Sequence, residues 1–179
     1  IESNTTIARN LTVTSGYFST GSNRDLTVSG AAAIAGTLTC NASTVVFGGS
    51  VTGVGTINCD TATITCADNF NPQTINMDAA SIDVVDRFGL ASTSSGSAVV
   101  SGTSAATIAC KRFIKTAFTA GHSTVTMDGS GVTNHIGLGS GAFWNLTVNS
   151  TGTKSLASPI TVSNNLTITD GILTTIEDT

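Results

Sequence analysis

A triplet made of an aliphatic residue, a Thr or Asn and a second apolar residue recurs along this 179-residue chain. The triplets occupy residues 11–13, 26–28, 38–40, 57–59, 64–66, 75–77, 125–127, 146–148, 160–162 and 166–168. Because side chains alternate between the two faces of a strand, each triplet places its apolar residues on one face and its polar residue on the other. A Gly, Asn or Asp follows nearby and supplies a corner. The triplets therefore predict many short, one-sided strands.

The composition agrees with an all-β fold. The chain contains 53 Ser and Thr residues, and 40% of its residues are hydrophobic while only 10% are charged. Val, Ile and Thr are stiff at χ1 and favour pleated structure. The one weak helical candidate is residues 105–117, and this segment suits a strand equally well.

The spacing of the triplets favours a parallel β-solenoid (β-helix) with irregular coils. Each triplet would form part of one coil and stack on the next coil. A conventional parallel sheet would need crossover helices, for which the sequence has no signal. An antiparallel β-sandwich stays open as the alternative, because Asp128-Gly129 and Asp170-Gly171 are typical hairpin turns. In either case we expect a single elongated β domain over residues 1–179.

The stretch FWNLTVNSTGTKSLASPITVSNNLTITDGIL, residues 143–173, contains the triplet pattern three times with an aromatic start and a Gly-x-Leu end. It resembles the repeats of large microbial surface proteins and adhesins, and also β-solenoid rods of phage tail fibres. Residues 10–16 echo it weakly. The resemblance implies an extracellular rod or filament, secreted or at a cell surface, and it carries over no catalytic residue.

The charge and hydropathy patterns limit which classes of partner we expect. Net charge is −4 and the seven Lys and Arg residues are mostly scattered, so we expect no nucleic-acid binding. No apolar run approaches the roughly 20 residues that span a membrane. The chain starts at Ile1 rather than Met, as expected of a processed chain or a fragment.

Four cysteines, Cys40, Cys59, Cys66 and Cys110, each follow an aliphatic residue by two positions, which turns them inward. One interpretation is that they are small core residues. The other is a disulfide between stacked coils, with three pairings open. An even count in a charge-poor, extracellular-type chain favours at least one disulfide. Their spacing matches no metal motif.

Six asparagines stand in Asn-x-Ser/Thr sequons and are candidate glycosylation sites: Asn4, Asn10, Asn41, Asn145, Asn149 and Asn165. Alternation turns Asn145 and Asn149 outward if Leu146 and Val148 point inward.

We find no catalytic constellation, and we expect no enzyme, no cofactor and no metal. His122 and His135 lie in Gly- and Ser-rich sequence that reads as loop. Asp78, Asp83 and Asp86 form the densest acidic patch, but nothing specifies the carboxylate separation that a glycosidase needs.

Strand-like sequence lies near both ends, at residues 7–14 and 166–176. Open strand edges template pairing with another chain, so we expect a homopolymer that assembles head to tail, with residues 1–14 as a subunit-linking strand donated to the next copy. The candidate subunit contacts are Ile7, Leu11, Val13, Phe143, Trp144, Leu166 and Ile168. The alternative function is a glycan-binding adhesin or tail-fibre segment, with Trp144 as the contact to sugar.

Overall fold

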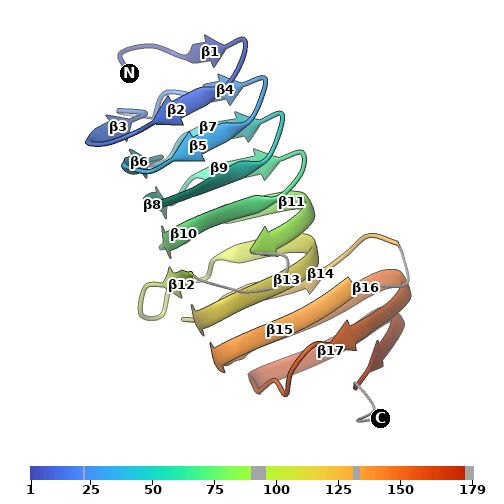
Figure 1. Cartoon of the computed structure of the whole chain (residues 1–179). Helices are drawn as coiled ribbons and strands as arrows, with labels where there is room; N and C mark the ends of the chain where they lie inside the picture. The colour runs from blue at the N-terminus through green and yellow to red at the C-terminus, as the bar shows by residue number, and fades with distance from the viewer. Residues whose placement is uncertain (22, 90–95, 131–133, 176–179) are drawn as a thin grey trace.

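The computed structural model describes residues 1–21, 23–89, 96–130 and 134–175. In these ranges the chain forms seventeen strands and no helix, arranged as a parallel β-solenoid of about 8 turns. Every strand pair described is parallel, which confirms the solenoid and excludes the antiparallel sandwich. Figure 1 shows the coils stacked from the N-terminal end to the C-terminal end, with the two termini at opposite ends of the stack.

Each complete coil has three walls. The first wall contains β1 (Thr5–Ile7), β4 (Leu26–Val28), β7 (Thr44–Phe47), β9 (Thr63–Cys66), β14 (Thr124–Met127) and the first parts of β11 (Ser81–Gly89), β13 (Thr107–Thr119), β16 (Phe143–Leu156) and β17 (Val162–Thr174). The second wall contains β2 (Leu11–Val13), β5 (Ala32–Ile34), the starts of β8 (Val51–Asp60), β10 (Phe70–Met77) and β15 (Asn134–Gly141), the middle of β13 and the ends of β11, β16 and β17. The third wall contains β3 (Tyr17–Ser19), β6 (Thr37–Thr39), β12 (Ser97–Val100) and the ends of β8, β10, β13 and β15.

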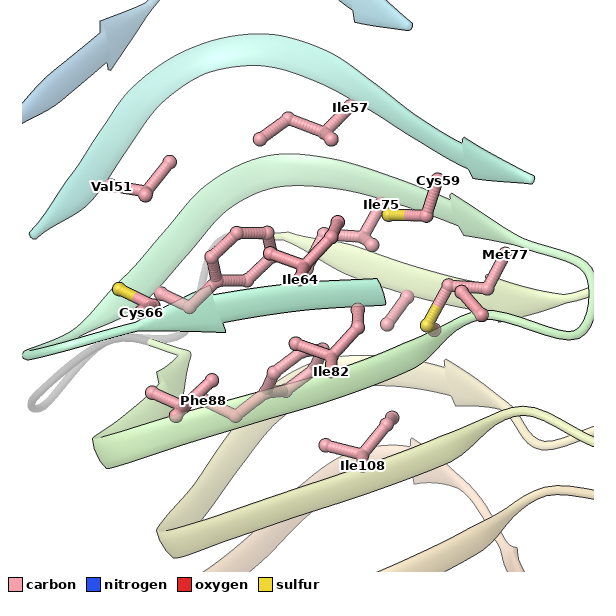
Figure 2. Packing of buried hydrophobic residues seen from close by; sticks show 14 of the residues in the cluster. Val51, Ile57, Cys59, Ile64, Cys66, Ile75, Met77, Ile82, Phe88 and Ile108 are labelled. Carbon is pink, nitrogen blue, oxygen red and sulfur yellow. The ribbon is translucent and has the colours of Figure 1, made fainter. Parts of the chain in front are cut away.

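The core is a set of columns that run through the stack, because equivalent residues of successive coils lie in register. One column of the first wall consists of Leu26, Val45, Ile64, Ile82, Ile108, Val125 and Leu146, all buried. The intervening Thr residues face outward, as the triplets predict. Figure 2 shows the central part of this core, where Ile64, Ile82 and Ile108 lie one above another. Coil length varies: stacked neighbours are 18 residues apart at Asn58 and Asn76, but 26 apart at Ser81 and Thr107.

Phenylalanine side chains line the inner face of the second wall. The ring centroids of Phe70 and Phe88 are 5.9 Å apart and those of Phe88 and Phe113 are 5.2 Å apart, both pairs stacked. Phe143 joins this group at 5.2 Å from Phe113. Such pairs contribute about 0.5–1.5 kcal/mol each beyond the burial of their area. The aromatic column therefore stabilises the contact between successive coils.

The structure decides two local alternatives that the sequence leaves open. Residues 105–117, the weak helical candidate, lie mostly in β13. The Asp-Gly pairs are not hairpin turns: Gly129 (φ 75°) follows the first-wall strand β14, which ends at Met127, and Gly171 (φ 87°) lies within β17. A solenoid corner and a hairpin both require left-handed backbone, so the same residue pair serves either fold.

Candidate functional site

The last coil described exposes an apolar row on its inner face. Leu166 and Ile168 are 51% and 48% exposed, whereas Leu146 and Val148, the residues stacked on them one coil earlier, are fully buried. The reason is geometric. β17 forms the first and second walls of this coil, and within the described residues neither a third wall nor a later coil covers it. We call Leu166 and Ile168 the terminal row.

The backbone of β17 is open on one side as well. β17 pairs in parallel with β16, Leu166 opposite Leu146 and Ile168 opposite Val148, and has no second partner in the part of the chain that the structure describes. An unpaired parallel edge presents N–H and C=O groups that a further strand can use. β17 also carries a single charged residue, Asp170, in its 13 residues. Natural proteins often protect strand edges from pairing by placing charged side chains on them. This edge has only one charged side chain.

The first coil is more closed than the last. Its three strands each pair with the coil that follows: β1 with β4, β2 with β5 and β3 with β6. Leu11 and Val13 are each only 7% exposed, and Ile7 is partly buried. Both strands of the 1–14 segment thus belong to the molecule's own first coil. Donation of this segment to another copy would require these pairings to break.

The aromatic pair Phe143 and Trp144 is divided between inside and outside. Phe143 is fully buried against Phe113 and Phe118, so it contributes nothing to an outer surface. Trp144 is half-buried, and its ring stacks on the exposed His122 with centroids 4.5 Å apart and planes at 24°. His135, which the sequence places in a loop, instead lies in β15.

The sequons differ in how free their amide nitrogens are. Asn41 Nδ2 donates to Gly21 O at 2.8 Å and lies within hydrogen-bond distance of the Ser19 and Thr20 hydroxyls. Asn145 Nδ2 donates to Thr124 Oγ1 at 3.2 Å. A glycan is attached at this nitrogen, and in these two sequons the nitrogen is already engaged in a hydrogen bond. The remaining sequon asparagines are exposed: Asn4, Asn10, Asn149 and Asn165.

Two lysines lie inside the solenoid, and no pattern in the sequence predicts their burial. Lys115 is 2% exposed; its Nζ donates to Pro72 O at 3.2 Å and lies 5.3 Å from the centre of the Phe88 ring. Lys154 is fully buried, and its Nζ donates to the carbonyl oxygens of Asp128 at 2.9 Å and Lys111 at 3.1 Å. Burial lowers the pKa of Lys115 to about 8 and also lowers the pKa of Lys154.

All four cysteines are buried, and this structure holds them in the reduced form. Burial raises the pKa of Cys40 to about 12 and raises the pKa of Cys59 and Cys110 strongly. In the reduced, folded protein these three thiols therefore stay protonated and are poor nucleophiles.

Two carboxylates of the acidic patch, Asp83 and Asp86, have different surroundings. Asp83 is exposed on the first wall, while Asp86 forms a bidentate ion pair with Arg112 of the next coil. Among the described residues, no three His, Cys, Asp or Glu side chains gather closely enough to hold a metal ion. The same part of the chain has no helix that is both long and apolar enough to cross a membrane.

Comparison of the chain with protein-family models, with curated proteins and with solved structures finds no match.

Proposed function

We propose that this protein is a structural subunit of an extracellular filament or surface layer, and that its copies assemble end to end. The observation that carries the proposal is the terminal row on β17, an exposed apolar surface directly beside an unpaired parallel strand edge. Adding one more coil would bury the row and pair the edge at the same time. Exposed apolar surface of this kind marks an interaction site.

The first coil of a second copy fits this position. Within one chain, Ile7 of β1 stacks on Val28 and Ile168 of β17 stacks on Val148, all in one inward column. A second copy placed with its β1 on β17 would continue the column, with Ile7 against Ile168, and would keep every strand parallel. The contact joins two different surfaces, so it is head to tail and produces an open fibre unless the rotation closes a ring. This arrangement stacks whole coils, and β1 and β2 keep their own pairings.

The test replaces Ile168 with Asp. A carboxylate in the terminal row would have to be buried without a partner on assembly, which opposes assembly strongly. Val85→Asp is the matched control, because Val85 is also an exposed aliphatic residue (63%) but lies in mid-stack on β11. Sedimentation velocity and electron microscopy across a concentration series should show fibres for the wild type and Val85→Asp, and monomers for Ile168→Asp. A wild-type chain that stays monomeric at all concentrations, or an Ile168→Asp variant that forms the same fibres, would refute the proposal.

A second candidate function, a glycan-binding adhesin or tail-fibre segment, draws support from the stacked Trp144 and His122 rings at the outer surface. One face of the indole is covered by the imidazole, and aromatic faces are suited to packing on sugar rings. Binding to a glycan array that is lost in Trp144→Ala but kept in Tyr17→Ala, an exposed aromatic of the first coil, would favour this function. Equal binding by both variants would count against it.

A further inference from the structure

Two of the four cysteines are nearest neighbours across consecutive coils. Leu38 of β6 lies opposite Ile57 of β8, and Thr39 lies opposite Asn58. The backbone N–H of Cys40 donates to Asn58 O at 2.8 Å, which completes the pairing of Thr39 with Asn58 and brings the next residues of the two coils, Cys40 and Cys59, alongside each other. Cys40 therefore stacks directly on Cys59.

The corner that follows each cysteine is also the same in the two coils. Asn41 and Asp60, the next residues, both adopt left-handed backbone, with φ of 52° and 47°. The carbonyl oxygen of Cys40 accepts from the N–H of Ser43, and that of Cys59 accepts from the N–H of Ala62, so both cysteines open the same turn. Equal backbone geometry directs both side chains into one buried column.

From this stacking we propose that Cys40 and Cys59 form a disulfide that cross-links two consecutive coils. Strands paired in register lie about 4.8 Å apart, inside the Cα separation of about 4.4–6.8 Å that disulfides span. The two thiols also interact electrostatically: burial raises the pKa of Cys59 most, and the neighbouring Cys40 raises it further. The inference does not depend on the proposed assembly, since both cysteines belong to one chain.

The same register excludes the other pairings. Val84 lies opposite Cys66 on one side and opposite Cys110 on the other, so these two cysteines are two coils apart, about 9.6 Å. That exceeds the roughly 7 Å limit for a bridge without backbone movement. Cys66 also stands at the far end of β9 from the corner that holds Cys59, with Ala62 and Ile64 between them. We therefore expect Cys66 and Cys110 to remain thiols.

The oxidant is a small-molecule disulfide such as oxidised glutathione. The thiolate of one cysteine attacks the reagent, forms a mixed disulfide and releases one small thiolate. The second cysteine, as a thiolate, attacks the protein sulfur of the mixed disulfide, forms the Cys40–Cys59 bond and releases the second small thiolate. The two protein thiols thus lose two protons and two electrons, and the reagent is reduced to two small thiols. Because both thiols are buried in the folded chain, we expect the bond to form during folding, before the coils close.

The test refolds the whole chain from denaturant in a buffer of oxidised and reduced glutathione, then blocks free thiols with N-ethylmaleimide under denaturing conditions. Cleavage after Phe47 and before Asp60 separates Cys40, Cys59 and the later cysteines onto different peptides. Mass spectrometry without reduction should find Cys40 joined to Cys59, with Cys66 and Cys110 alkylated. Reduction should lower the thermal midpoint by about 5–10 °C. The same oxidant added to folded, reduced protein should form the bond far more slowly.

Variants keep the test independent of folding defects. Cys40→Ser and Cys59→Ser should each abolish the link, and Cys66→Ser is the matched buried control that should keep it. If either of the first two fails to fold, the double variant Cys66→Ser with Cys110→Ser retains only the proposed pair and should still form it. A Cys66–Cys110 link, a mixture of pairings, or four alkylated cysteines after oxidative refolding would overturn the proposal. None of these outcomes bears on whether Ile168→Asp blocks fibres.

Discussion

Lys115 is a cation buried in an apolar solenoid, and its ammonium donates to Pro72 O. Burial lowers its pKa from 10.5 to about 8. Below pH 8 both the folded and the unfolded chain hold the proton. Between pH 8 and 10.5 the unfolded chain still holds it while the folded chain has lost it, so the free energy of unfolding rises with pH over this window.

We expect Lys115→Met to remove this pH dependence. Urea denaturation at a series of pH values should show the stability of the wild type rising relative to the variant between pH 8 and 10.5, by up to about 3 kcal/mol. The buried thiols have raised pKa values and act in the opposite direction as pH rises, but they are the same in both proteins and cancel in the difference. A difference that stays constant with pH would show that Lys115 does not change its protonation on folding in this range.

At the scale of elements, the corner between the second and third walls contains a stack of glycines, Gly16, Gly36 and Gly55. A Cβ on Gly55 would lie 2.1 Å from Gly36 O, and a Cβ on Gly36 would lie 2.6 Å from Gly16 O. Gly16 belongs to the first coil, and a Cβ there meets no atom within 4 Å. Close approach of one coil's backbone to the next therefore requires glycine at the two inner positions.

We predict that Gly55→Ala destabilises the protein by about 3 kcal/mol or more, because the coils must separate to admit the methyl group. Gly16→Ala is the matched control. Its methyl group would meet no neighbouring atom, so the only destabilising effect is the left-handed backbone (φ +73°), and we expect a loss of stability of about 1–2 kcal/mol. Thermal unfolding of both variants gives the comparison. Equal losses would mean that backbone conformation, rather than contact between coils, sets the requirement for glycine.

The buried positions could be predicted from a period of two only within the part of a strand that stays in one wall. The triplets predict buried Leu26 and Val28 correctly, because a short strand on one wall keeps a period of two. β13 turns two corners without a break, and its buried residues, Ile108, Cys110, Phe113, Lys115 and Phe118, are spaced alternately by two and three. Each corner shifts the phase, so a period-two pattern misplaces Lys115. The exposure of Leu166 and Ile168 could not be predicted either, because their triplet has the same pattern as the buried ones.

At the scale of the whole molecule, a stack of coils has no single centre, since each coil contacts only its neighbours. Stability is then lowest where a coil has one neighbour instead of two. The last coil described is also incomplete, with its terminal row uncovered, whereas the first coil has all three walls and buries Leu11 and Val13. The two ends of the solenoid should therefore open unequally, and the C-terminal end should open more readily.

Hydrogen exchange measured by mass spectrometry tests this asymmetry and its link to assembly. In dilute protein, amides of β17 should exchange fastest, those of the first coil at an intermediate rate, and those of β9 and β11 slowest, because opening of the mid-stack coils requires unfolding of their neighbours. In fibres, β17 and the first coil should both slow toward the mid-stack rate, since each end gains the neighbour that it lacks. Ile168→Asp should keep the dilute pattern at every concentration, and Val85→Asp should follow the wild type. Protection that appears on the outer walls instead, with β17 still exchanging rapidly, would show that the fibres are held by side-to-side contacts and not by stacked ends.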